Sequence, residues 1–288
     1  MTSEKPHTAV LLARGPDRKG LVATIAGFLY RHGANILHAD QHNDALAGMF
    51  FQRIEFVLDG MDLSFPQLQE QLRPVMAELG MSFEVFNSEV VPRVAILVSK
   101  LEHCLLDLLS RSRAGELRGE IAVVASNHET LRPLAETSGV PFVYLPVTPE
   151  TRETQEEQLL ALLARERIDL VVLARYMQIL SPRVVQAYPL RIINIHHSFL
   201  PAFRGARPYH QAAERGVKLI GATSHLVTEV LDDGPIIEQD VVRVTHRDTI
   251  ADMQRKGRDL ERLVLARAVR LWLERRILSY GNKTVVFD

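Results

Sequence analysis

The chain has 288 residues, which is long enough for two domains. Its hydrophobic share of 47% and charged share of 24% are those of an ordinary globular protein, which excludes disordered, collagen-like and coiled-coil chains. The 34 Lys and Arg residues nearly balance the 35 Asp and Glu residues, so no overall charge favours nucleic acid or an anionic membrane as a partner. The single cysteine, Cys104, excludes an intramolecular disulfide and a multi-cysteine metal site.

The start of the chain and its apolar runs bear on where the protein is located. Residues 1–10 lack a basic segment followed by a long apolar run, and no window reaches eighteen apolar residues. We therefore expect neither a signal peptide nor a membrane span, and a location in the cytoplasm.

The first third of the chain has the pattern of one compact unit. Apolar residues at helical spacing predict helices at 20–33 and 64–79, and apolar runs predict strands at 7–14, 35–41, 49–58 and 82–88. The resulting order, βαββαβ, is that of a ferredoxin-like domain. Pro92 follows this unit and marks the expected boundary, with one domain at 1–91 and a second at 92–288.

The rest of the chain alternates between strands and helices. Short, nearly continuous apolar runs are typical of parallel strands buried on both faces, and they predict strands at 93–99, 120–126, 141–147, 169–175 and 191–198. Helical spacing is clearest at 151–167 and 249–277. We therefore expect an α/β domain with a doubly wound, mostly parallel sheet.

Polar residues gather where three of these strands end, at Ser99–His103, Arg175–Met177 and Asn194–Ser198. Ligands of open parallel sheets bind beyond the carboxyl ends of the strands, so these segments are candidates for a site. Asn194 and His196 are two positions apart in a strand and share one face. An amide can donate to a developing oxyanion, and an imidazole can exchange a proton near neutral pH.

The acidic turn at 229–235 could bring a carboxylate, that of Asp232, to the same place. Such a carboxylate would hold the proton of the imidazole and order a water molecule. Taken alone, an Asn-X-His pair is common, and Asp-Asp-Gly-Pro is an ordinary turn sequence. The residues by themselves therefore indicate only a candidate acid/base site at a sheet end.

Several separated motifs give the second domain a family resemblance. Asn-Ile-His at 194–196, Ser-Phe-Leu-Pro at 198–201, His225 on a later strand and Leu-Asp-Asp-Gly-Pro at 231–235 occur in order. This series resembles the signature of the formyltransferase domain that uses formyltetrahydrofolate. The resemblance extends over most of 93–280 and implies that fold for this part of the chain.

The same resemblance implies roles for individual residues. Asn194, His196 and Asp232 correspond to the three catalytic residues of the family. The segment 173–182 resembles the lining of the folate pocket, although core packing at a strand end would otherwise be the simpler interpretation. The folate-binding residues expected on this basis are Arg175, Met177, Gln178, Ile179, Leu180, His225 and Thr228.

The segment after the first strand of the second domain bears on the acceptor of the formyl group. Relatives that formylate a phosphorylated amine have a glycine-rich loop there, whose N–H groups bind the phosphate. This chain has no glycine between Val94 and Ala114, and Glu102 places a carboxylate there, although a carboxylate also suits a first helical turn. The whole chain resembles the formyltetrahydrofolate deformylase family. This implies hydrolysis of 10-formyltetrahydrofolate to tetrahydrofolate and formate, in one-carbon metabolism and formate supply to purine biosynthesis.

The front domain resembles the ACT family of small-molecule-binding domains over residues 16–36. That resemblance implies an amino-acid effector near Gly20 and Asn35, and we expect a homo-oligomer. A module that serves only for oligomerisation remains the alternative.

In the expected mechanism, Asp232 deprotonates a water molecule directly or through His196, and Asn194 and protonated His196 stabilise the oxyanion. We expect no cofactor and no metal, because adjacent His196 and His197 should point to opposite faces of a strand and could not join His225 around zinc. Two other functions stay open, formyl transfer to an amine and a non-catalytic amino-acid sensor. The near-neutral charge argues against a tRNA acceptor.

Overall fold

The computed structural model describes residues 6–202 and 208–287. The chain divides into two compact units. One contains Met1–Val91, Arg275–Ser279 and Val285–Asp288, and the other contains Pro92–Glu274 and Tyr280–Thr284. The first unit therefore takes residues from both ends of the chain.

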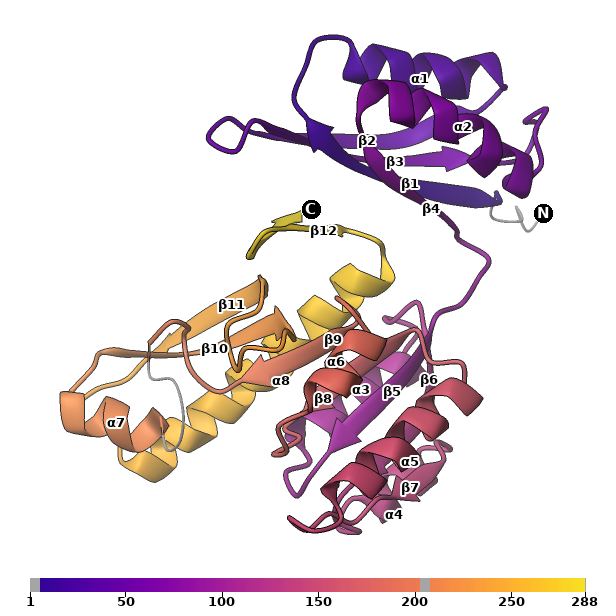
Figure 1. Ribbon diagram of the computed structural model, residues 1–288. Helices are drawn as coiled ribbons and strands as arrows, with labels where there is room; N and C mark the ends of the chain where they lie inside the picture. The colour runs from indigo at the N-terminus through magenta and orange to yellow at the C-terminus, as the bar shows by residue number, and fades with distance from the viewer. Residues whose placement is uncertain (1–5, 203–207, 288) are drawn as a thin grey trace. The chain divides into compact units, whose positions relative to one another are not determined.

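The first unit has two helices on one face of a four-stranded antiparallel sheet of order β2-β3-β1-β4 (Figure 1). Its elements are β1 (Thr8–Pro16), α1 (Leu21–Arg31), β2 (Asn35–Asp44), β3 (Met49–Val57), α2 (Phe65–Leu79) and β4 (Ser82–Asn87). The predicted βαββαβ order and ferredoxin-like fold are confirmed. The second strand is longer than expected, because β2 continues to Asp44 alongside β3.

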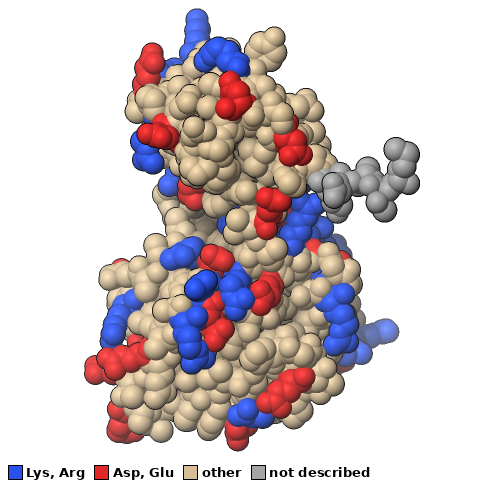
Figure 2. Space-filling model, turned by 90° about the vertical axis from the view of Figure 1, so that its right-hand side faces the viewer, with Lys and Arg blue, Asp and Glu red and all other residues tan. Residues whose placement is uncertain are grey.

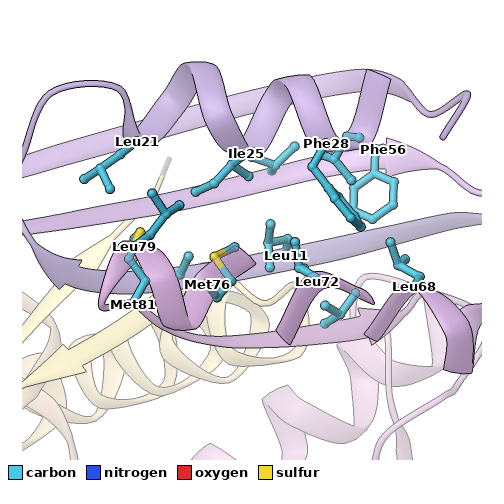
Figure 3. Packing of buried hydrophobic residues seen from close by; sticks show 14 of the residues in the cluster. Leu11, Leu21, Ile25, Phe28, Phe56, Leu68, Leu72, Met76, Leu79 and Met81 are labelled. Carbon is cyan, nitrogen blue, oxygen red and sulfur yellow. The ribbon is translucent and has the colours of Figure 1, made fainter. Parts of the chain in front are cut away.

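The core of the first unit lies between this sheet and the two helices. Leu11 and Phe56 from the strands meet Ile25 from α1 and Leu72 from α2, all of them almost completely buried (Figure 3). Full burial of a large apolar side chain contributes about 1.5–3 kcal/mol to folding. Ser64 begins α2 with a capping box, in which its backbone N–H donates to Gln67 Oε1 over 2.9 Å.

The second unit is built on a seven-stranded sheet of order β11-β10-β9-β8-β5-β6-β7. The strands are β5 (Arg93–Val98), β6 (Glu120–Ser126), β7 (Phe142–Tyr144), β8 (Leu170–Ala174), β9 (Ile192–His196), β10 (Leu219–Leu226) and β11 (Ile236–Arg243). The first five are parallel, as predicted, and β10 and β11 extend the sheet in antiparallel pairing. The helices are α3 (His103–Arg113), α4 (Arg132–Thr137), α5 (Arg152–Arg165), α6 (Pro182–Ala187), α7 (Pro208–Arg215) and α8 (Ile250–Leu273).

The end of the chain corrects one prediction. The apolar spacing predicts a single helix over 249–277, but α8 ends at Leu273 and is followed by a hairpin of β12 (Ile277–Tyr280) and β13 (Lys283–Val286). Arg275 has a φ of 55°, in the left-handed region, which a continuing α-helix does not accommodate.

Of the residues after α8, the segment Arg275–Ser279 packs with the first unit rather than with the rest of 92–288. The backbone carbonyl of Arg275 accepts a hydrogen bond of 3.1 Å from Arg53 Nε, and the Arg275 guanidinium lies 4.1 Å from the ring centroid of Phe86. Arg14 donates to the carbonyl of Ser279. The compact units thus differ from the expected ranges 1–91 and 92–288 over this short segment.

Candidate active site

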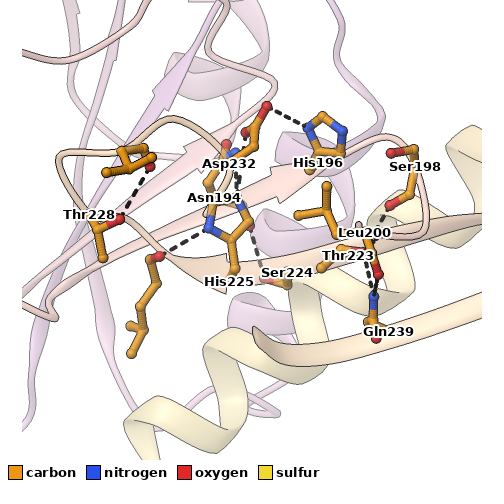
Figure 4. Close-up of polar contacts among 12 residues, drawn as sticks. Asn194, His196, Ser198, Leu200, Thr223, Ser224, His225, Thr228, Asp232 and Gln239 are labelled. Carbon is orange, nitrogen blue, oxygen red and sulfur yellow. Dashed lines mark hydrogen bonds and ion pairs between the residues drawn. The ribbon is translucent and has the colours of Figure 1, made fainter. Parts of the chain in front are cut away.

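The site is assembled from two adjacent antiparallel strands and the turn between β10 and β11. In the register of β9 with β10, Asn194 lies opposite His225 and His196 lies opposite Thr223. Asn194 and His196 therefore share a face, as predicted from their spacing, and His225 joins them across the sheet. Asp232 approaches from the turn that follows β10 (Figure 4).

Two imidazoles surround the carboxylate of Asp232. His196 Nδ1 is 3.2 Å from Asp232 Oδ2, and His225 Nε2 is 3.7 Å from Asp232 Oδ1. His225 Nε2 also lies 3.2 Å from Asn194 Nδ2, and its Nδ1 lies 3.0 Å from the carbonyl of Leu226, to which it donates. The structure thus brings together all three predicted catalytic residues and one predicted folate-binding residue, His225.

The turn that carries Asp232 has a strained backbone. Asp232 has a φ of 52°, which a residue with a side chain rarely adopts. Nearby, the N–H of Leu226 donates to the carbonyl of Pro235 over 2.9 Å and ties the turn to β10. Gly234 is required for this close approach, because a Cβ on it would lie 1.8 Å from the carbonyl oxygen of Leu226.

The surroundings of Asp232 keep it ionised. Its partial burial opposes ionisation, but the hydrogen bond from His196 and the neighbouring ring of His225 outweigh that effect and hold the pKa of this carboxyl well below its usual value. Because a carboxylate only accepts hydrogen bonds, His196 must carry its proton on Nδ1, the atom that faces Asp232.

The other ring nitrogen of His196, Nε2, is chemically the most informative atom of the site. It is buried, and no hydrogen-bond partner for it exists within residues 6–202 and 208–287. With the proton on Nδ1, Nε2 has a free lone pair and can accept a proton from a bound molecule. A buried polar atom without a protein partner is typical of a position that a ligand or water completes.

The segment after His196 is fixed to β10 and β11 by a short hydrogen-bond network. Leu200 N–H donates to Thr223 Oγ1 over 3.0 Å, and that hydroxyl donates to the carbonyl of Ser198 over 2.8 Å. Gln239 Nε2 reaches the carbonyl of Leu200 and the hydroxyl of Thr223 (Figure 4). Of the loop noted in the sequence, residues 203–207 lie outside the described residues.

The predicted folate segment presents apolar side chains to the surface. Met177 and Ile179 are 61% and 60% exposed, which is unusual for large apolar residues so close together in one loop. The N–H of Met177 donates to Ser99 Oγ over 3.1 Å, so this loop is held to the end of β5. Gln178, Leu180 and Thr228 are half-buried.

Arg175 lies apart from the other predicted folate-binding residues. Its side chain is only 11% exposed, and its Nε is 3.4 Å from Glu261 Oε2 on α8. The guanidinium is therefore engaged with a buried acid rather than displayed beside the exposed side chain of Met177. Gly20 and Asn35, the predicted effector residues, are exposed positions of the first unit.

The sequence predicts that the side chains of His196 and His197 point to opposite faces of a strand, but in the structure they do not. The two ring centroids are 5.2 Å apart and the rings are tilted by 56°. The reason is that β9 ends at His196, so the strand rule that sends neighbouring side chains to opposite faces does not reach His197. Burial and the charge of Arg175 lower the pKa of His197 to about 4, which keeps this ring neutral.

Sequence reasoning missed a second polar cluster around Glu261. His103, Cys104 and Glu261 offer ligand atoms within 4.8 Å of one another, the spacing of a metal site. The guanidinium of Arg175 and the thiol of Cys104, whose pKa burial raises well above its usual value, both disfavour a cation there. One sequence signal could have pointed to this cluster. Gly257 is an isolated glycine inside a long helix, which usually indicates that another group packs closely against the helix there.

The distribution of charged side chains on the surface agrees with the nearly equal numbers of basic and acidic residues. Basic and acidic side chains are interspersed on the face shown in Figure 2. Among helices of the described residues, none combines the length and the apolar character needed to cross a bilayer.

The chain matches two family models, the ACT domain over residues 9–75 and the formyl transferase family over residues 92–269. It is 55% identical to a formyltetrahydrofolate deformylase of Synechocystis, over 97% of this chain and 98% of that protein. The crystal structure of a formyltetrahydrofolate deformylase from Pseudomonas syringae superposes with a TM-score of 0.97 at 47% identity, covering 100% of this chain and 96% of that one.

More distant structures match a smaller share of the chain. A glycinamide ribonucleotide transformylase from Symbiobacterium toebii is 34% identical with a TM-score of 0.66, covering 69% of this chain and 95% of that chain. The class of protein is therefore an ACT domain joined to a formyl transferase domain that carries an Asn-His-Asp cluster at the carboxyl end of β9. Within that class, the chain belongs to the formyltetrahydrofolate deformylase family.

Proposed function

We propose that this protein hydrolyses 10-formyltetrahydrofolate to tetrahydrofolate and formate, and that Asn194, His196 and Asp232 perform the reaction. The observation that supports this most strongly is the buried, unpartnered Nε2 of His196, whose opposite ring nitrogen is fixed by Asp232. Among residues 6–202 and 208–287, no protein group meets this proton acceptor, which leaves it available to a bound water or substrate. Family membership supplies the substrate class.

In the first step, a water molecule attacks the formyl carbon while His196 Nε2 accepts one of its protons. The carbonyl oxygen becomes an oxyanion. The amide of Asn194 donates to it from Nδ2, whose position is set by His225 Nε2 at 3.2 Å. A neutral amide donor stabilises this charge without binding the ground-state carbonyl as strongly.

In the second step, the tetrahedral intermediate collapses and the bond between the formyl carbon and the folate nitrogen breaks. The protonated His196 returns its proton to that nitrogen, which leaves as the amine of tetrahydrofolate. The formyl carbon retains one oxygen from the substrate and one from water, so the second product is formic acid, which ionises to formate. His196 ends in its starting protonation state.

Asp232 acts through His196 in this proposal. Its pKa is held low by the two imidazoles, so it is a weak base toward water but a strong electrostatic partner for an imidazolium. It fixes the proton of the neutral ring on Nδ1 and stabilises the charged ring once Nε2 has taken a proton. The sequence leaves open whether Asp232 acts on water directly or through His196, and we therefore propose the route through His196.

The exposed apolar side chains of Met177 and Ile179 are proposed to contact the folate ring system, with Gln178, Leu180 and Thr228 around it. Flat heteroaromatic rings bind preferentially against apolar surface with a few polar contacts at the edge. We exclude Arg175 from direct folate contact, because its side chain is buried against Glu261.

Water rather than a phosphorylated amine is proposed as the acceptor. The segment after β5 has no glycine, and two of its polar side chains are already engaged. Ser99 Oγ donates to Asn127 Oδ1 over 2.8 Å, and His103 Nε2 is 2.8 Å from Glu261 Oε2. A phosphate loop instead offers free backbone N–H groups and room for close approach.

The first unit is proposed to bind an amino acid and to assemble the protein as a homo-oligomer. Gly20 precedes α1 with a φ of 92°, and a Cβ added there would meet no atom within 4 Å, so the helix start has room for a ligand. Asn35 is exposed where β2 begins. No cofactor is needed for the proposed chemistry, and the single buried Cys104 suits the cytoplasm as its location.

The test is to incubate the purified protein with 10-formyltetrahydrofolate and no amine, and to measure formate and tetrahydrofolate. Equal amounts of both products are expected, with His196→Ala losing at least about a hundredfold in kcat. Formation of product only after an amine is added would replace hydrolysis by formyl transfer. Size-exclusion chromatography with light scattering, with and without each amino acid, tests the role of the first unit.

A further inference from the structure

A buried carboxylate outside the proposed site, that of Glu261, joins four elements of the second unit. It lies on α8 and is 1% exposed. Its Oε1 accepts a hydrogen bond of 2.8 Å from the hydroxyl of Tyr209 on α7. Its Oε2 lies 2.8 Å from His103 Nε2, where α3 begins, and 3.4 Å from Arg175 Nε, after β8.

The charges of this cluster are compensated internally. Burial opposes the ionisation of Glu261, but the hydrogen bond from His103 and the charge of Arg175 outweigh it and lower the pKa of the carboxyl. Tyr209 stays protonated, because burial and the neighbouring Glu261 raise the pKa of its phenol well above the usual value. The Tyr209 hydroxyl therefore stays protonated and donates a hydrogen bond to the ionised carboxylate of Glu261.

Gly257 on α8 leaves space for the side chain of Tyr209. It stands one helical turn before Glu261, on the same face of α8. A Cβ at Gly257 would lie 1.9 Å from the hydroxyl oxygen of Tyr209 and 2.5 Å from its Cζ. A glycine in the middle of a helix costs about 1 kcal/mol relative to alanine. Here it leaves the space that lets the phenol reach the carboxylate four residues further on.

The aromatic rings continue from this cluster to the proposed site. The ring of His197 lies between two others, with centroids 6.0 Å from that of Tyr209 and 5.2 Å from that of His196. Both pairs are tilted, by 58° and 56°, which is a favourable arrangement for aromatic contacts. His196 is thereby restrained on one side by its bond to Asp232 and on another by a ring that Tyr209 supports.

We propose that Tyr209, held by Glu261 in the space left by Gly257, is a positioning residue for the reaction, acting through His197 on the orientation of His196. The inference rests on the proposed catalytic role of His196. A catalytic ring must stay within about 0.5 Å of its productive position, and a misplacement of about 1 Å can cost a hundredfold in rate. Loss of the support should lower kcat and leave folate affinity unchanged.

The primary test is Tyr209→Phe, which removes only the hydroxyl that bonds to Glu261. We expect kcat to fall about tenfold. KM for 10-formyltetrahydrofolate should stay within about threefold, because the exposed side chains of Met177 and Ile179 belong to a loop whose backbone is held by Ser99 and not directly by this hydroxyl. The matched control is Tyr188→Phe, another buried tyrosine of the same unit, in the core beside β8 and β9, which should keep wild-type kcat.

A second pair of variants tests the space on α8. Gly257→Ala should lower kcat at least as much as Tyr209→Phe, because the new methyl group displaces the phenol. In a Tyr209→Leu background the same Gly257→Ala change should alter kcat less than about twofold, since the clashing atoms are gone. Such non-additivity is expected only if the two residues act on activity through each other.

Circular dichroism and thermal unfolding of every variant establish the folded fraction, to which kcat is normalised. A kcat of Tyr209→Phe within about twofold of wild type would overturn the inference. So would a rise in KM with unchanged kcat, or a loss that disappears on normalisation to folded protein. His196→Ala in the same assay separates the two claims. If it remains active, the proposed catalytic site fails. If it is inactive while Tyr209→Phe is normal, only the positioning role fails.

Discussion

Replacing Asp232 by Asn removes one negative charge from the site with little change in volume. The amide oxygen of Asn can still accept the hydrogen bond from His196 Nδ1, which spans 3.2 Å in the wild type. What is lost is the attraction between the carboxylate and the imidazolium that forms when Nε2 takes a proton from water. The variant therefore separates charge stabilisation from geometry.

The size of the loss follows from that distance. Two unit charges 3.2 Å apart attract with about 5 kcal/mol at an effective dielectric constant of about 20. This is an upper bound, because the carboxylate is 13% exposed and a second imidazole, His225, shares it. A loss of about 3–5 kcal/mol in transition-state stabilisation corresponds to about two to four decades in kcat.

Steady-state kinetics of formate release measure this effect, with folate binding and thermal unfolding as controls for the integrity of the site. We expect Asp232→Asn to bind folate like the wild type and to remain folded. The matched control is Asp233→Asn, which removes a charge from the neighbouring position of the same turn and should alter kcat less than about threefold. If Asp232→Asn keeps kcat within a few-fold of wild type, the carboxylate has no part in the mechanism.

Three further outcomes are expected. Gly234→Ala should destabilise the fold by about 1–3 kcal/mol in chemical unfolding and lower kcat at least about tenfold, because its Cβ would meet the carbonyl of Leu226; wild-type kinetics would refute the tight-turn argument. The pKa of His197 is lowered to about 4 from 6.5, so the unfolded chain binds a proton before the folded chain as the pH falls from 6.5 to 4, and the free energy of unfolding falls over that window. In His197→Asn this fall should be smaller, by up to about 3 kcal/mol in total. The same dependence of the unfolding free energy on pH in both proteins would contradict a depressed pKa. Glycinamide ribonucleotide in large excess should neither be formylated nor slow formate release, as followed by mass spectrometry; a formylated amine would show that the segment Ser99–His103 admits a phosphorylated acceptor.

The parts of the fold that the sequence predicts well are those with a strong apolar period. The parallel strands follow from continuous runs such as that of β8, and the ferredoxin-like unit follows from the helical spacing of α1 and α2. The hairpin of β12 and β13 escapes prediction because its strands have four residues each, and a helical period from α8 runs into them. Only the backbone reversal at Arg275, which composition does not reveal, separates the two.

The three proposed catalytic residues can be predicted from the sequence, whereas the surroundings of Arg175 and Glu261 cannot. Asn194 and His196 follow from strand alternation, and family resemblance adds Asp232, which lies far along the chain in an otherwise ordinary turn. The position of Arg175 after a strand groups it with the folate residues, whereas its φ of 63° and its pairing with Glu261 are visible only in three dimensions. A glutamate on an amphipathic helix looks like part of a solvated face, so the helical pattern offers no reason to expect the burial of Glu261.

The central claim is that water accepts the formyl group. Hydrolysis in water enriched in oxygen-18, at neutral pH and without any amine, tests it most directly. We predict that each formate released by the enzyme carries one oxygen-18 atom and that tetrahydrofolate forms in equal amount. Formate without the label, or no turnover until an amine is supplied, would contradict it.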